Sequence, residues 1–392
     1  MLRIPPPIAF LYGAQNSISP SFGQVWKATE SWHLVGEAQR VTGLGLESIL
    51  LGRAGEGVAD PVITSLLTFV CSLMVAETTI RFGTVPTFHA GYSGGQFSAL
   101  AASGVITFRQ GLELVIERSL AIAEASKEYA GLMMVAAEVD HSLMETICAH
   151  NEEAWISAYD SKRRVLLGGS SGAIENLCIS LRNRTIGART KVVRDAAIHT
   201  PLMEPAARNL RRLLRTLPLR RPSQGVFSIV DGNAYLDEGP LRLHVGNELT
   251  EPVQWCRTIE NLEAAGVELA VEVGSASSLA RLTRRASAGF DVCSVSTPDE
   301  ARRVVRRGEL EMSQTELWGA IGKVCVSPGA GVFRPDDLLG VGQRMAVGQI
   351  LGWVNETEVR SCHEGTIRVA RAVAGERLRE FEPIVWLDML AP

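Results

Sequence analysis

The segment Val85–Gly104 constrains the fold of this chain more than any other. It reads VPTFHAGYSGGQFSALAASG, a short apolar run, a glycine-rich turn around Ser93 and an alanine-rich run. Glycine lets a backbone bend sharply without a Cβ clash, and G-x-S-x-G is the pattern of a nucleophile elbow, where a strand turns into a helix and presents a serine hydroxyl. The backbone N–H of Gly94 would then face the oxygen that becomes negative during acyl transfer. The pentapeptide also occurs in ordinary loops, so the interpretation depends on its neighbours.

The segments on either side of this turn predict an α/β fold. Ile8–Tyr12 (IAFLY) is short and apolar, as a buried strand is, and a polar turn that contains Gln15 follows it. Such strand ends carry the functional loops of α/β sheets. Phe108–Glu128 has its apolar residues at helical spacing, and Arg118 lies off that stripe. Taken alone, Gln15 could be a plain loop amide and Arg118 could lie on a solvated helix face.

The elements predicted for residues 131–195 differ from those around them. Strand-like and helix-like segments follow one another as βαββαβ, from GLMMVAAEV to TKVVR, which is the ferredoxin-like order. We therefore expect a subdomain that is inserted into the larger α/β unit. The next segment, Ala196–Met203, places His199 between a strand and a helix, although most loop histidines are ordinary polar residues.

The C-terminal part contains an internal repeat. Gly342–Trp353 reads GQRMAVGQILGW and Gly375–Trp386 reads GERLREFEPIVW, with the same spacing from Gly to Trp. Two similar halves predict a small all-β sandwich over residues 319–392. The charged residues 296–318 are typical of a partly helical linker, so the first domain is expected to cover residues 1–295.

Charge and cysteine content exclude several classes of function. The net charge of −4 gives no reason to expect a nucleic acid or an anionic membrane as partner. The seven cysteines are scattered without a C-x-x-C pair, which argues against a disulfide framework and a cysteine zinc site and for a reducing compartment. Pro61–Ala76 is uncharged but shorter than the ~20 apolar residues of a membrane span. With no secretory leader pattern at the N-terminus, we expect a cytoplasmic protein.

Several separated motifs within residues 8–290 resemble those of the malonyl-CoA:acyl-carrier-protein transacylase family, in the family's order. The transacylase subunit of malonate decarboxylases is a near relative with a similar elbow. The family's F-P-G-Q-G, G-H-S-x-G, F-H-S-P-L-M, P-V-x-W and E-V-G-P-G motifs are similar to Tyr12–Asn16, Gly91–Gly95, Ile198–Met203, Pro252–Trp255 and Glu272–Ala276. The family's helical arginine falls on Arg118.

The resemblance implies a role for each of these positions. Ser93 would be the nucleophile, and His199 would take its proton and later deliver one. A backbone carbonyl at Glu248, where the family usually has Gln, would orient His199. The backbone N–H groups of Gly94 and Gln15 would form the oxyanion hole.

Arg118 would determine which class of acyl substrate binds. A guanidinium clamps a carboxylate with two charge-assisted hydrogen bonds, and a malonyl thioester ends in a carboxylate. Tyr92 and Ile198 replace a His and a Phe of the family and would change the shape of the pocket, together with the small Gly94. An alkylmalonyl substrate therefore stays open.

The segment Val326–Leu387 resembles the biotinyl/lipoyl carrier domains. That family attaches its cofactor to a Lys in the hairpin between the halves, but no Lys follows Lys323 in this chain. We therefore expect neither biotin nor lipoate on this domain. A docking or oligomerisation module and a stabilising appendage stay equally open.

Together these observations predict an α/β hydrolase-like parallel-sheet core, a ferredoxin-like insert and a C-terminal β domain. The predicted enzyme moves a malonyl or alkylmalonyl group from coenzyme A to the phosphopantetheine thiol of an acyl carrier protein, in fatty-acid or polyketide biosynthesis. It would need no metal and no bound cofactor. Two alternatives stay open, an editing hydrolase that acts on acyl carrier proteins and a non-catalytic scaffold with a docking barrel.

Overall fold

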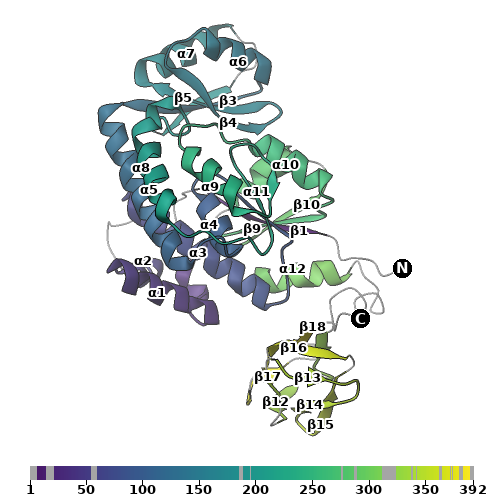
Figure 1. The fold of residues 1–392 in the computed structure, drawn as a ribbon. Coiled ribbons are helices and arrows are strands. Elements are labelled where there is room, and N and C mark those ends of the chain that lie inside the picture. The colour runs from purple at the N-terminus through teal and green to yellow at the C-terminus, as the bar shows by residue number, and fades with distance from the viewer. Residues whose placement is uncertain are drawn as a thin grey trace. The chain divides into compact units, whose positions relative to one another are not determined.

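The structure is a computed structural model, and its described residues form two compact units (Figure 1). The larger unit lies within residues 6–305, and the chain after Val305 builds the smaller one. The described residues are 7–14, 22–53, 60–184, 189–194, 196–274, 277–286, 289–310, 324–336, 339–340, 342–361, 364–370, 372, 374–378 and 383–388.

The larger unit has a mixed α/β fold around a six-stranded sheet of order β10-β9-β1-β2-β7-β8. Every neighbouring pair is parallel except β7 and β8. The strands are β1 (Ile8–Tyr12), β2 (Phe88–Gly91), β7 (Gly225–Phe227), β8 (Ala234–Tyr235), β9 (Leu269–Val273) and β10 (Asp291–Val295).

Strand β1 explains why this sheet is buried on both faces. Phe10 and Tyr12 belong to one apolar cluster, whereas Ala9 and Leu11 belong to another. Alternate residues of a strand point to opposite faces, so an unbroken apolar run suits a parallel sheet that helices cover on both sides. The strand predicted at Ile8–Tyr12 is confirmed.

Helices surround the sheet, and helix α3 is long and largely apolar. Among the described residues it is the one helix long and apolar enough to cross a membrane, but 67% of its most apolar window is buried inside the unit. It packs on α5, whose predicted bounds are confirmed. The helices are α1 (His33–Thr42), α2 (Leu46–Leu50), α3 (Pro61–Arg81), α4 (Gly95–Ala102), α5 (Phe108–Glu128), α8 (Glu204–Thr216), α9 (Glu238–Asn247), α10 (Trp255–Ala264), α11 (Ser278–Ala286) and α12 (Pro298–Leu310), with short 3-10 turns at Phe22–Val25, Glu30–Trp32 and Pro201–Met203.

Residues 131–194 form a second, antiparallel sheet of order β4-β5-β3-β6 (Figure 1). Two helices and an apolar cluster of its own accompany this sheet. The chain order is β3 (Gly131–Ala137), α6 (His141–Ala149), β4 (Ala154–Ser161), β5 (Arg164–Ser170), α7 (Ser171–Arg184) and β6 (Arg189–Arg194). Backbone bonds join it to the segment before α10, because Val253 N–H donates to Ser157 O and Tyr159 N–H donates to Val253 O, both at 2.9 Å.

The smaller unit contains two four-stranded antiparallel sheets around one apolar cluster. Each copy of the sequence repeat supplies a two-residue strand and a longer strand. Each sheet contains the short strand of one copy and the longer strand of the other. The first sheet consists of β11 (Val324–Val326), β18 (Pro383–Asp388), β16 (Gly365–Ala370) and β13 (Arg344–Met345), and the second of β15 (Thr357–Arg360), β14 (Ile350–Val354), β12 (Gly331–Pro335) and β17 (Arg377–Leu378).

The larger unit continues beyond its predicted end at residue 295. Helix α12 begins within the segment predicted as a linker, and Ala301 and Val304 on it are buried in the core of the larger unit. The helix packs on the core because Ala301 and Val304, three residues apart, lie on one face of it.

Glu272 ties the end of β9 to the start of α11. It is 2% exposed, and its two carboxylate oxygens accept the N–H groups of Leu279 at 3.2 Å and Ala280 at 2.6 Å. Burial raises the pKa of Glu272 from 4.5 to about 7. The folded protein therefore retains a proton that the unfolded chain loses at lower pH.

Glu272→Gln is expected to change how the free energy of unfolding depends on pH. Between pH 4.5 and about 7 the folded state binds more protons than the unfolded state, so Glu272 lowers the stability as the pH rises through this window. The total is on the order of 3 kcal/mol. Urea unfolding of wild type and of Glu272→Gln at several pH values measures this contribution. The difference in free energy of unfolding, wild type minus Glu272→Gln, should fall as the pH rises from 4.5 to about 7. Parallel curves would contradict the expectation.

Candidate active site

Ser93 lies at the tip of a tight turn between β2 and α4. Its φ angle is +52°, a backbone conformation that residues other than glycine rarely adopt. Such conformations are typical of functional turns. A Cβ on Gly91 would lie 2.3 Å from the backbone of Gly95, and a Cβ on Gly95 would lie 2.1 Å from Tyr12 O of β1. The strand–turn–helix predicted at Gly91–Gly95 is present, and only glycine fits at both of its ends.

Gly95→Ala is expected to destabilise the protein and to displace Ser93, because its methyl group would meet a backbone carbonyl. Overpacking of this kind costs typically 1–3 kcal/mol. Gly36→Ala on α1 is the matched control, since a Cβ there would meet no described atom within 4 Å, and alanine within a helix stabilises by ~0.5–1 kcal/mol. Thermal unfolding of the two variants should therefore shift in opposite directions. A Gly95→Ala protein as stable as wild type would contradict the steric account.

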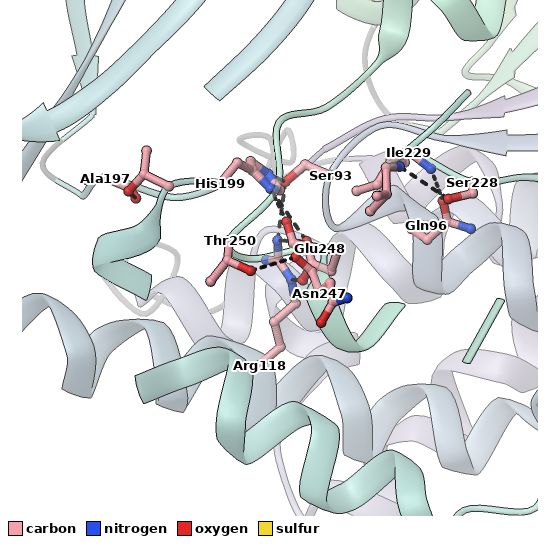
Figure 2. A network of polar contacts seen from close by, with 12 residues as sticks. Ser93, Gln96, Arg118, Ala197, His199, Ser228, Ile229, Asn247, Glu248 and Thr250 are labelled. Atoms are coloured by element: carbon pink, nitrogen blue, oxygen red, sulfur yellow. Dashed lines mark hydrogen bonds and ion pairs between the residues drawn. The ribbon is translucent and has the colours of Figure 1, made fainter. Parts of the chain in front are cut away.

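His199 reaches Ser93 from the segment before α8 (Figure 2). Its Nε2 lies 2.8 Å from Ser93 Oγ, and its Nδ1 lies 2.5 Å from the backbone oxygen of Glu248. A carbonyl oxygen only accepts, so Nδ1 carries the proton and Nε2 is free to accept one from the serine. Glu248 directly follows the last residue of α9, where backbone carbonyls lack partners within the helix.

Arg118 is buried, and Glu248 holds it. Arg118 is 6% exposed, its Nε donates to Glu248 Oε1 at 2.6 Å, and its Nη2 donates to Glu248 Oε2 at 3.1 Å. The same Nη2 lies 3.2 Å from Ser93 Oγ. The solvated alternative for Arg118 is therefore wrong, and four residues predicted from separate motifs, Ser93, Arg118, His199 and Glu248, meet at one point.

Arg118→Ala is expected to lower the free energy of unfolding by about 3–5 kcal/mol, because it leaves the carboxylate of Glu248 buried without its partner. The double variant Arg118→Met/Glu248→Gln should recover most of that loss, since neither new side chain carries a charge. Arg81→Ala breaks solvent-accessible ion pairs with Glu77 and Glu30 and is expected to cost less than ~1 kcal/mol. Urea unfolding measures all three, and equal losses for Arg118→Ala and Arg81→Ala would contradict the buried-pair account.

Tyr92 connects the elbow to the inserted sheet. Its hydroxyl donates to Asp160 Oδ1 at 2.6 Å, and Arg164 Nε donates to Asp160 Oδ2 at 2.8 Å. Burial, followed by the neighbouring Asp160 carboxylate, holds the pKa of Tyr92 well above its usual range. Sequence reasoning missed Asp160 because it lies inside an ordinary strand, β4.

Some of the residues predicted to form the pocket line a cavity in the structure, and others do not. Gly94 and Arg118 line a small cavity of about 20 Å³ beside Ser93. Tyr92 and Ile198, predicted to shape the pocket, do not line this cavity: Asp160 holds the Tyr92 hydroxyl, and Ile198 is 2% exposed within the main core. Gln15 lies outside the described residues. Gln96, which had not been singled out, accepts the N–H of Ile229 at 3.1 Å and holds the loop after β7 against α4.

Comparison with known proteins places this geometry in a family. Residues 18–321 match the model of the acyl transferase domain. This chain belongs to the acyl transferase family. It is 30% identical over 287 residues to the malonyl CoA-acyl carrier protein transacylase of Salmonella typhimurium, covering 71% of this chain and 92% of that protein. Its identity to the transacylase of the same name from Bacillus subtilis strain 168 is 23% over 300 residues, covering 74% and 94%.

Solved structures have the same fold as this acyltransferase. A type II polyketide-synthase acyl-carrier protein in complex with its malonyl-transacylase matches with a TM-score of 0.72 and 24% identity, over 77% of this chain and 99% of that one. The malonyl CoA-acyl carrier protein transacylase of Coxiella burnetii matches with a TM-score of 0.73 and 21% identity, over 78% and 99%.

Proposed function

We propose that this acyltransferase moves a malonyl group from coenzyme A to the phosphopantetheine thiol of an acyl carrier protein through an acyl-Ser93 intermediate. The observation that carries the proposal is the position of Ser93 Oγ, 2.8 Å from His199 Nε2 and 3.2 Å from Arg118 Nη2. The first contact supplies a base to the nucleophile. The second brings a cation to the place where the far end of a short acyl group would lie.

In the first half-reaction, Ser93 Oγ attacks the thioester carbonyl while His199 Nε2 takes the serine proton. The negative oxygen that forms faces the N–H of Gly94 at the start of α4, where the helix dipole also favours negative charge. Gln15 would supply a second N–H. When the C–S bond breaks, His199 returns its proton to the coenzyme A thiolate, and Ser93 carries the acyl ester.

In the second half-reaction, the carrier thiol attacks the ester carbonyl and gives its proton to His199. The C–Oγ bond then breaks, and His199 protonates Ser93 Oγ. The contact between His199 Nδ1 and Glu248 O supports this use of one imidazole as base and acid, because it holds the ring and stabilises its charged form. This chemistry requires neither a metal nor a bound cofactor.

The same proposal assigns the other parts of the chain. Residues 131–195 would be a ferredoxin-like subdomain that forms one wall of the site, as the bond between Tyr92 and Asp160 supports. Residues 319–392 would be a biotinyl/lipoyl-like domain without its modification, which serves docking or oligomerisation. The cysteines are scattered along the sequence without a C-x-x-C pair, which supports a cytoplasmic location.

Intact-protein mass spectrometry after mixing with malonyl-CoA tests the function. Wild type is expected to gain one malonyl group and to lose it when a phosphopantetheinylated carrier protein is added. Ser93→Ala should gain nothing, Ser171→Ala at the start of α7 should behave like wild type, and His199→Ala should load about 10²–10⁴-fold more slowly.

Each failure of this experiment has a distinct meaning. An adduct that water removes faster than a saturating carrier protein does would identify an acyl-thioester hydrolase. A wild-type protein that forms no adduct would support a non-catalytic scaffold.

A further inference from the structure

The ion pair of Arg118 and Glu248 leaves only part of the guanidinium for a substrate. Nε and one hydrogen of Nη2 point at the two oxygens of Glu248. The remaining donors are Nη1 and the second hydrogen of Nη2, which faces Ser93 Oγ at 3.2 Å. A carboxylate on an acyl group attached to Ser93 can therefore bind only the outer edge of the guanidinium, because Glu248 occupies the inner edge.

Glu248 also sets the charge of the site before any substrate arrives. Arg118 and Glu248 are both buried, and together they are neutral. The carboxylate of a malonyl group would be a second anion on one guanidinium, and it would lie within a few ångströms of Glu248 in a place that water screens poorly. This repulsion offsets part of the attraction that Arg118 provides.

An uncharged acyl group has the opposite balance. Beside an arginine without a partner it would leave a buried cation uncompensated, which is unfavourable. Here Glu248 already compensates the charge of Arg118, so an uncharged acyl group can bind beside Arg118 without leaving a buried charge unpaired. We propose that Glu248 determines the selectivity of Ser93 and that short uncharged acyl thioesters, of the acetyl class, are a second class of substrate beside malonyl. This inference rests on the proposed acylation of Ser93.

An acyl group on Ser93 would extend toward the cavity that Gly94 and Arg118 line, and this cavity would limit its size. It holds about 20 Å³ between Gly94, Phe97, Val115 and Arg118, which is close to the space that one water molecule needs. A methyl group fits such a space and a long alkyl chain does not, while a malonyl carboxylate would lie outside it, on the outer edge of Arg118. The uncharged substrates should therefore be short.

A competition experiment tests the inference on the whole protein. Wild type, Glu248→Gln and Glu251→Gln are each mixed with equal amounts of malonyl-CoA and acetyl-CoA, and intact mass spectrometry gives the ratio of the two adducts. Gln at 248 keeps the backbone carbonyl that faces His199 Nδ1. It removes the negative charge and leaves Arg118 one acceptor oxygen in place of two. Glu251 is exposed and three residues further on, so Glu251→Gln makes the same chemical change away from Arg118.

Wild type should form both adducts. Glu248→Gln should raise the ratio of malonyl to acetyl by about tenfold or more, and Glu251→Gln should leave it unchanged. The ratio compares two substrates in one sample, so partial unfolding of a variant does not alter it.

Three results would overturn the inference while the acyl-serine proposal stands. They are a wild type that loads malonyl but no acetyl, a ratio that Glu248→Gln leaves unchanged, and a ratio that Glu248→Gln lowers. The first of these needs no variant, so the test does not depend on the folding of Glu248→Gln. A wild type that forms neither adduct would overturn the acyl-serine proposal itself and the inference with it, which distinguishes the two failures.

Discussion

The close approach of Gly95 to the carbonyl of Tyr12 is the constraint on which the site depends. It brings the start of α4 against the end of β1, in the middle of the sheet, with no room for a side chain between them. The chain can make this approach only through a sharp turn, and Ser93 at its tip takes a positive φ as a result. The position of the serine is therefore set by backbone packing in the core.

The other groups of the site come from parts of the chain that are far apart in sequence. Arg118 comes from α5, His199 from the segment after the inserted sheet, and Glu248 from the end of α9. Each is held by a bond to the next, so that the buried polar groups compensate one another. The hydrogen bond from Tyr92, the residue before Ser93, to Asp160 connects the elbow to the inserted sheet.

Local patterns in the sequence predicted the elements well. The apolar run at Ile8–Tyr12 and the helical spacing of Phe108–Glu128 depend on near neighbours, and the structure has both elements at these bounds. The side-chain roles of Glu248 and Asp160 could not be predicted in this way, because the partner of each lies far away along the chain. For Glu248 only its backbone was expected to act, and its carboxylate is what holds Arg118. The end of the larger unit was misplaced for a related reason, since the charged residues of α12 hid the two apolar positions that pack on the core.

Position 248 orients His199 through its backbone and holds Arg118 through its side chain, so substrate choice can change while the backbone bond to the base is kept. The backbone oxygen that orients His199 is present whatever the side chain is. The side chain bonds Arg118, and its Oε2 also lies 3.7 Å from His199 Nδ1, so only a polar side chain of the same size can replace it without loss of the buried network. A change between Glu and Gln needs a single nucleotide substitution, so an acyltransferase of this design can move between acyl donors in one genetic step while its nucleophile and base stay in place.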